Sequence, residues 1–112
     1  MKKIDAIIRT HRLDDIVNRL WLIGVTGMTL AEVHGMSAST TSTGVFHGQR
    51  LTMSSAPRLQ LTVVVRDDDA AHVVNAIVHA ARTEARGDGI ITVIDVLGVM
   101  RIRTGEVDGD AI

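Results

Sequence analysis

The sequence has no cysteine, one proline and only two aromatic residues, Trp21 and Phe46, among its 112 residues. The lack of cysteine excludes disulfide bonds and thiolate metal sites. Proteins that bind single-stranded nucleic acid usually stack bases on aromatic rings, so the shortage of rings argues against that class. The formal net charge of −1 gives no overall positive field for nucleic acid or an anionic membrane. We therefore expect no nucleic-acid partner.

Long apolar runs are also missing. No stretch approaches the roughly 20 apolar residues that cross a bilayer, and the apolar run after Lys3 is too short and interrupted for a signal peptide. We expect a cytoplasmic chain that does not insert into a membrane. The composition, 46% hydrophobic and 22% charged, is typical of a globular chain, and its length fits a single domain over residues 1–112. A chain this short buries a modest fraction of its surface, so assembly with copies of itself would add stability.

The hydrophobic residues follow a strand period in some segments and a helix period in others. Strands are predicted at 4–9, 27–34, 59–65 and 90–99, and helices at 13–23 and 70–81. Asp14 and Asp15 lie in the first turn of one helix, and the aspartates at 67–69 are predicted to cap the other. The two strand–helix–strand halves predict an α+β fold of the ferredoxin-like type. This fold is a double βαβ with a four-stranded antiparallel sheet and two helices on one face.

The other face of this sheet would be open. Candidate residues for the open face are Ile7, Val63, Val65, Ile91 and Val93. An apolar sheet face needs a cover, so we predict self-association.

The segment at 36–57 has a different character. Serine, threonine and glycine are frequent in it, and the hydrophobic periodicity is weak. About 20 residues of this kind are unusual inside a compact domain, where such loops are generally functional or disordered. We predict a mobile loop that projects from the domain. A polar tail at 100–112 follows the last strand.

Two motifs could hold an anion. The glycines of Gly87-Asp88-Gly89 would let backbone N–H groups converge on an anion, but they also suit an ordinary tight turn before a strand. In Arg101-Ile102-Arg103, alternation along an extended segment would place both guanidinium groups on one side, which suits a di- or triphosphate. The alternative for this motif is a solvated edge with surface ion pairs. Arg58 and Arg86 could join such a cluster.

The sequence gives little support for a metal site or for a catalytic site. His72 and His79 share a helix face but are seven residues apart, whereas a pair of metal ligands on a helix prefers a spacing of about three or four. The serines and threonines cluster at 36–57, without a neighbouring base or a nucleophile elbow. We predict no metal site, no catalytic residue and no enzyme activity.

Several motifs are shared with a known family. In the first half they are Lys2-Lys3-Ile4-Asp5-Ala6-Ile7-Ile8, Leu13-Asp14-Asp15, Gly24-Val25-Thr26-Gly27-Met28-Thr29 and Glu32-Val33. In the second half they are Gly87-Asp88-Gly89, Asp95-Val96, Val99 and Arg101-Ile102-Arg103-Thr104-Gly105-Glu106. In these motifs and in its length, the chain resembles the PII nitrogen-regulatory signalling proteins. The likeness spans nearly the whole chain outside 36–57.

The resemblance implies a homotrimer of ferredoxin-like subunits whose sheets line its centre. It implies three sites for ATP or ADP, with or without Mg²⁺, in the clefts between subunits. The segment at 36–57 would be the family's T-loop, which docks on a target protein such as a transporter, an enzyme or a regulator in nitrogen or related metabolism. Family members switch targets according to ATP, ADP and 2-oxoglutarate.

The resemblance also implies a set of nucleotide-binding residues. They are Thr29, Gly35, Ser37, Arg58, Val64, Gly87, Asp88, Gly89, Arg101 and Arg103. Thr29, Gly35 and the backbone of Val64 match the adenine and ribose side of the family's pocket. The stretch 87–89 matches the phosphate loop, and the arginines at 101 and 103 match residues that reach across from the neighbouring subunit. The arginine at 58 stands where the family usually has lysine.

The chain departs from the family at several ligand positions. Ile90 replaces a basic residue, which should weaken phosphate binding by about 1–3 kcal/mol, although Arg86 could compensate. Thr62 replaces an acidic residue. The stretch 37–39 replaces one that supplies an arginine and a glutamine. That glutamine helps to hold magnesium and 2-oxoglutarate, so its absence argues against sensing of 2-oxoglutarate.

The projecting segment departs as well. Leu51 stands at the tyrosine that is uridylylated or adenylylated in many relatives, so we expect that switch to be absent. Gln49 stands at a phosphorylated serine, and His47 at the arginine that plugs ammonium channels. These departures leave two alternatives open. One is a degenerate PII-like trimeric binding module that has lost nucleotide or 2-oxoglutarate sensing, and the other is a related trimer that binds a different small ligand.

Overall fold

The computed structural model describes residues 1–46 and 49–112, and it describes the side chains of residues 1–37 and 55–112. The elements are β1 (Lys2–Ile8), the 3₁₀ turn η1 (Thr10–Arg12), α1 (Leu13–Leu22), β2 (Thr29–Phe46), β3 (Gln49–Val65), α2 (Asp67–Ala81), β4 (Gly89–Asp95) and the 3₁₀ turn η2 (Asp108–Asp110). The expectations for His47, Gln49 and Leu51 lie outside the described side chains.

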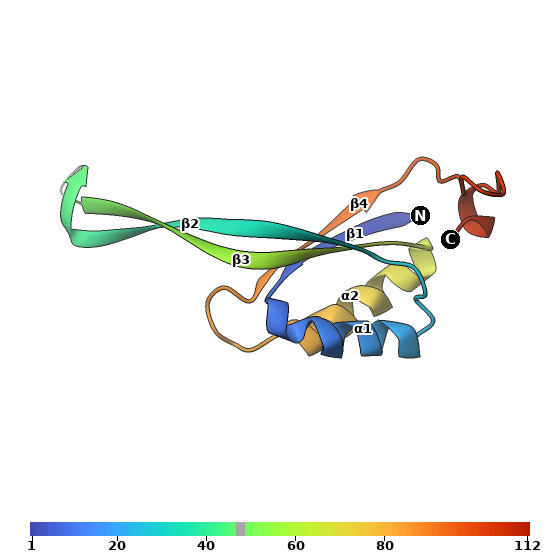
Figure 1. Cartoon of the computed structure of the whole chain (residues 1–112), viewed down its shortest axis with the longest axis horizontal. Coiled ribbons are helices and arrows are strands. Elements are labelled where there is room, and N and C mark those ends of the chain that lie inside the picture. The colour runs from blue at the N-terminus through green and yellow to red at the C-terminus, as the bar shows by residue number, and fades with distance from the viewer. Residues whose placement is uncertain (47–48) are drawn as a thin grey trace.

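The four strands form one antiparallel sheet in the order β2-β3-β1-β4. The central strand β1 pairs with β3 from Lys2↔Val65 to Ile8↔Leu59, and with β4 from Lys2↔Asp95 to Ile8↔Gly89. Both helices lie side by side on one face of the sheet (Figure 1). The predicted ferredoxin-like double βαβ is therefore confirmed.

The core lies between the sheet and the two helices. In β1, every second residue from Ile4 to Ile8 is buried, because alternate side chains of a strand point to the same face. The fully buried large side chains are Ile4, Ile8, Ile16, Leu20, Leu61, Val63, Val73 and Ile77. Both helices thus contribute an apolar stripe to a single core, as the helix periods predicted.

The predicted membership of the open face is largely wrong. The register pairs Val63 with Ile4 and Val65 with Lys2, so both valines face the helices and are buried. Ile91 and Val93 lie on the same helix side by their register with β1. Of the five candidates only Ile7 remains on the open face. By register that face holds Lys3, Asp5, Ile7, Gln60, Thr62, Val64, Ile90, Thr92 and Ile94, a mixture of polar and apolar residues.

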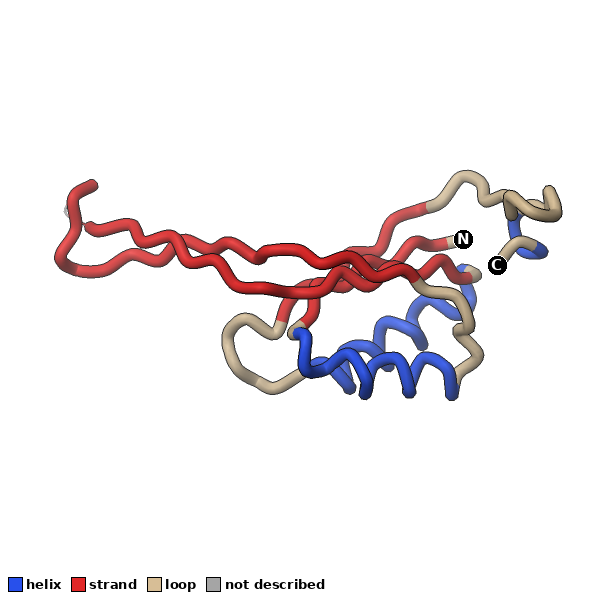
Figure 2. Tube along the Cα trace, in the orientation of Figure 1, coloured by secondary structure: helices blue, strands red, loops and turns tan. Residues whose placement is uncertain are grey.

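The segment at 36–57, predicted as a loop, belongs to a long hairpin. β2 and β3 pair continuously from Thr29↔Thr62 to Thr41↔Arg50, far beyond the sheet (Figures 1 and 2). The projection was predicted, but its strand structure was not. The strands escape a hydrophobic-period analysis because the serine- and threonine-rich sequence of this segment carries no apolar alternation.

The ends of two other elements differ from the prediction. α2 begins at Asp67 with Arg66 as its N-cap, so the aspartates at 67–69 form its first turn and do not cap it. Asp67 accepts a hydrogen bond from the N-terminal ammonium group of Met1 at 2.7 Å. β4 ends at Asp95, four residues earlier than predicted. In the tail, Met100 pairs with Val107 in an isolated bridge.

The longest described helix, α2, has 15 residues. In the part of the chain that the structure describes, no helix combines the length and apolar character that a membrane span requires.

Candidate functional site

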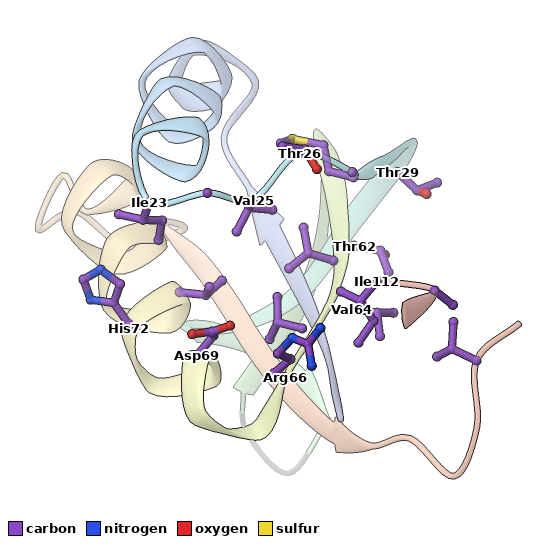
Figure 3. Close-up of a pocket in the computed structure, with 18 of the residues that line it drawn as sticks. Ile23, Val25, Thr26, Thr29, Thr62, Val64, Arg66, Asp69, His72 and Ile112 are labelled. Carbon is purple, nitrogen blue, oxygen red and sulfur yellow. The ribbon is translucent and has the colours of Figure 1, made fainter. Parts of the chain in front are cut away.

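A cleft of about 650 Å³ opens where the connection from α1 to β2 passes the ends of β3 and the start of α2. Figure 3 shows its wall, with Thr26 and Thr29 on the connection and the start of β2, and Thr62 and Val64 on β3. Arg101 lines the same cleft from the tail. Three of the predicted ligand residues, Thr29, Val64 and Arg101, therefore come together within one chain.

The tail is folded back on itself beside this cleft. The Gly105 N–H donates to the Arg101 carbonyl at 2.8 Å, and the Arg101 N–H donates to the Glu106 carbonyl at 2.8 Å. The segment 101–105 is therefore a turn, and the prediction of an extended segment with Arg101 and Arg103 on one side is wrong. The Arg101 guanidinium donates to the Ala111 carbonyl at 3.2 Å, whereas Arg103 is exposed and does not line the cleft.

Three further polar residues line the cleft that sequence reasoning missed. Arg66, Asp69 and His72 lie at the start of α2 (Figure 3). The Arg66 guanidinium donates to the Gly109 carbonyl at 2.6 Å, which ties the tail to the helix. Their spacing of three residues was the available signal, because residues at i and i+3 share one side of a helix.

A second cluster surrounds the loop between α2 and β4. The Arg9 side chain leaves the end of β1 and donates from Nε to Asp88 at 3.2 Å and from Nη2 to the Arg86 carbonyl at 2.6 Å. Arg58 Nη2 lies 3.1 Å from the position that a Cβ atom on Gly87 would take, and Gly35 lies against the Arg58 stem. The structure thus groups Gly35, Arg58 and Gly87, and Gly35 is not near the adenine-side residues with which it was predicted.

The two glycines of this loop are required by its geometry. Gly87 and Gly89 have φ values of +91° and +115°, a region that favours glycine. A Cβ atom on Gly89 would lie 1.7 Å from the Ile7 carbonyl oxygen. Glycine is therefore required at position 89 by the tight turn into β4 and by the close approach to β1, whether or not the loop binds an anion.

The Asp88 carboxylate points back into its own loop. It accepts hydrogen bonds from the Thr83 hydroxyl, from the Thr83 N–H at 2.8 Å, from Arg9 and from the Glu84 N–H at 2.9 Å. These donors, the Thr83 hydroxyl first, lower the pKa of Asp88 to about 2. The carboxylate is therefore ionised throughout the physiological range.

The structure also shows where Ser37, Ile90 and Thr62 lie. Ser37 is exposed on β2, two residues beyond Gly35. Ile90 follows Gly89 on the open face and is 66% exposed. The Thr62 hydroxyl donates to Asp5 at 2.5 Å across the strands, and this bond lowers the pKa of Asp5.

The cleft and the loop cluster lie toward opposite ends of the sheet. The phosphate-loop motif precedes β4 and Arg101 follows it, so the seven residues of β4 separate them by about 20 Å at a strand rise of ~3.4 Å per residue. A single chain therefore carries eight of the ten predicted ligand residues in two separate groups, with Ser37 and Arg103 outside both. We call them the cleft half (Thr29, Val64 and Arg101) and the loop half (Gly35, Arg58 and Gly87–Gly89).

No metal centre is found among the described side chains. Across residues 1–37 and 55–112, no three histidine, aspartate or glutamate side chains gather closely enough to hold a metal ion.

The sequence and the fold were compared with known proteins. Residues 1–106 match the family model described as "Nitrogen regulatory protein P-II". Over all 112 residues, the chain is 43% identical to the nitrogen regulatory protein P-II of Klebsiella oxytoca and to the nitrogen regulatory protein P-II 1 of Escherichia coli strain K12. In each case the alignment covers 100% of both chains.

The solved structures agree with the sequence comparison. B. subtilis GlnK is similar over 99% of this chain and 97% of its own, with a TM-score of 0.89 and 27% identity. The B. subtilis GlnK-ATP complex is similar over 99% and 96%, with a TM-score of 0.91 and 27% identity. The resemblance seen in the terminal motifs is therefore confirmed over the full length, and the chain belongs to the nitrogen regulatory protein P-II family.

Proposed function

We propose that this protein binds ATP or ADP between neighbouring copies of a homotrimer and passes the nucleotide state to a target protein through its β2–β3 hairpin. The observation that carries the proposal is the separation of the ligand residues into a cleft half and a loop half at opposite ends of the sheet. Neither half alone offers both a nucleoside cleft and a phosphate loop. A neighbouring copy would bring a loop half to each cleft half.

The chemistry of the two halves is complementary to an adenine nucleotide. In the cleft half, the Thr29 hydroxyl, the Val64 backbone and the apolar wall suit a base and a ribose. In the loop half, glycine N–H groups and a guanidinium suit phosphate oxygens. Within the described side chains Arg58 forms no ion pair and donates only to the Pro57 carbonyl, so its charge is available for a ligand. Arg101 would add charge from the cleft half, and the exposed Arg103 would add charge from the tail beside it.

The B. subtilis GlnK-ATP complex supports the assignment of the ligand, because this chain has the same fold and belongs to the same family. ATP would be bound with or without Mg²⁺, which the phosphate oxygens would hold, since no metal ligand is assigned on the chain. Sensing of 2-oxoglutarate is not proposed, because 37–39 does not supply the family's arginine and glutamine.

The hairpin would transmit the signal. Gly35 lies on β2 at the base of the hairpin, where an added Cβ atom would lie 3.6 Å from the Arg58 Cγ on β3, and Arg58 in turn lies beside Gly87. A ligand that contacts Arg58 therefore acts directly on the root of the projection. Two nucleotides that favour different arrangements of the hairpin would give the protein different affinities for its target. The target would be a transporter, an enzyme or a regulator in nitrogen or related metabolism. P-II proteins are signalling regulators and not enzymes, and we expect this one to act in the cytoplasm.

Isothermal calorimetry with ATP, ADP and AMP tests the ligand. We expect ATP and ADP to bind, and Arg101→Ala to weaken ATP binding by about tenfold or more, because a hydrogen bond to a charged group contributes about 1.5–3 kcal/mol. Arg19→Ala, which removes an exposed arginine of α1, is the matched control and should bind like the parent. Binding of none of the three nucleotides below about 1 mM would refute the proposal.

A second function is favoured by Ile90 and Thr62. Ile90 places an apolar side chain directly after the phosphate loop, and the Thr62 hydroxyl is already bonded to Asp5. The alternative is a degenerate trimeric module that binds its target without sensing a nucleotide. In that case the parent binds no nucleotide, and Ile90→Lys creates binding by restoring a cation. Tight binding by the parent would exclude this alternative.

A further inference from the structure

The loop between α2 and β4 is held by polar contacts and hardly by packing. Residues 82–87 are all exposed, so little apolar burial is available to fix their conformation. Within this loop and its junction with β4, Glu84, Gly87 and Gly89 have φ values of +65°, +91° and +115°. For Glu84, which is not a glycine, such a backbone conformation persists only where surrounding contacts determine it.

Those contacts converge on Asp88. Its carboxylate accepts from the N–H groups of Thr83 and Glu84 at 2.8 and 2.9 Å and from the Thr83 hydroxyl. The Thr83 hydroxyl in turn accepts from the Ala85 N–H at 3.3 Å. The start of the loop is thereby tied to its end through one side chain.

Arg9 fastens the same loop to the sheet. It donates to the Asp88 carboxylate and to the Arg86 carbonyl from the end of β1, and the two side chains are 23% and 24% exposed. The charged groups that face the Asp88 carboxylate are thus Arg9, directly after β1, and, beyond Gly87, Arg58 on β3. We name Thr83, Asp88 and Arg9 the loop clasp.

We propose that the loop clasp fixes the glycine N–H groups of 87–89 in a phosphate-receiving arrangement before any nucleotide arrives, and that Asp88 is a positioning residue that does not touch the ligand. The inference rests on the proposed function. Its physical basis is preorganisation, because a loop that is already ordered loses less conformational entropy on binding. A carboxylate turned toward its own loop also keeps a negative charge away from the phosphates.

The first experiment measures the loop without nucleotide. Amide hydrogen exchange of the full-length protein is compared for the parent, Asp88→Asn, Thr83→Val and Thr83→Ser. The Thr83 and Glu84 N–H groups share one carboxylate oxygen, and Arg9 and the Thr83 hydroxyl share the other. An asparagine amide nitrogen in either place faces a donor that it cannot accept from, the two N–H groups or Arg9, so Asp88→Asn should loosen the clasp and speed exchange at the Thr83 and Glu84 N–H groups about tenfold or more. Thr83→Val should act in the same direction, and Thr83→Ser, which keeps the hydroxyl, should exchange like the parent.

Asp68→Asn is the matched control for lost charge. The Asp68 carboxylate is exposed in the first turn of α2 and makes no hydrogen bond or ion pair with any described residue, so the exchange profile of the loop in this variant should equal that of the parent. If Asp88→Asn also leaves the loop amides unchanged, the clasp does not exist and the proposal fails.

The second experiment separates phosphate from nucleoside by calorimetry with ATP and adenosine. If Asp88 is a positioning residue, Asp88→Asn weakens ATP binding about tenfold and changes adenosine binding by less than about twofold. Thr83→Ser, which keeps the hydroxyl, retains the parental affinity for ATP. With a direct contact, removal of the negative charge strengthens ATP binding while the exchange rates stay parental, which overturns the proposal. If the parent binds neither ligand, the proposed function fails and with it the phosphate role of the loop, whereas the exchange rates still decide whether the clasp exists.

Discussion

At the scale of single residues, Asp88 links pH to stability. Its pKa in the folded chain is about 2 and its ordinary value is 3.8. Between these values the unfolded chain binds more protons than the folded one, so the stability that Asp88 contributes is present above about pH 4 and is lost as the pH falls toward about 2.

We therefore expect the free energy of unfolding, measured with urea from about pH 5 downward, to fall less steeply for Asp88→Asn than for the parent. Asp68→Asn should retain the parental slope. Parallel curves for the parent and Asp88→Asn would contradict the assigned hydrogen bonds.

Gly89 is the residue at which any side chain should be least tolerated. The positive φ alone costs a non-glycine residue about 1–3 kcal/mol, and the added Cβ atom would meet the Ile7 carbonyl 1.7 Å away. Gly89→Ala should lower the free energy of unfolding by more than this amount. Gly27→Ala is the control, because nothing lies within 4 Å of its added Cβ, and it should change stability by less than about 1 kcal/mol. Equal losses for the two variants would contradict the register of β1 and β4.

At the scale of secondary structure, Leu61 and Leu30 test which part of the hairpin belongs to the core. They are cross-strand partners on the helix side of the sheet, but Leu61 is fully buried and Leu30 is 45% exposed. Leu61→Ala should cost about 2–5 kcal/mol because it leaves a cavity, whereas Leu30→Ala should cost well under that. The free energy of unfolding would be measured for both at one protein concentration. Similar losses of unfolding free energy for the two variants would mean that Leu30 belongs to the core as fully as Leu61 does.

The same scale explains what the sequence could predict of the fold. Both helices and the core parts of all four strands were found, because each has one face on the core and a hydrophobic period results. The faces of β3 and β4 were assigned wrongly, because Val63, Val64 and Val65 are all apolar and only pairing with β1 decides which of them points inward. The outer hairpin was missed because its serine- and threonine-rich sequence has no hydrophobic period.

At the scale of the whole molecule, the sequence proposes residues for the site but not their arrangement. The motifs around Gly87 and Arg101 supply residues of the two proposed halves. Their separation by the length of β4 could not be derived, because it depends on strand order and register. Arg9 was missed because its partner Asp88 lies far along the chain and no local spacing marks such a pair. Arg66 was missed although it shares a three-residue spacing with Asp69 and His72.

A site divided between neighbouring copies makes a prediction that no single-chain site would meet. Arg101→Ala damages only the cleft half, and Arg58→Ala damages only the loop half, so each protein alone should bind ATP about tenfold more weakly or worse. When the two are co-expressed with different tags and the mixed assembly is purified, every cleft with an intact Arg101 can meet a neighbouring loop with an intact Arg58.

A trimer that contains both variants, in either ratio, has one site of its three with both halves intact, so about a third of the sites should regain parental affinity. Calorimetry of the mixed assembly measures that fraction. Each variant mixed with a differently tagged copy of itself is the control and should restore none. If the mixed assembly also restores none, both halves act within one chain, and the arrangement proposed for the nucleotide is wrong.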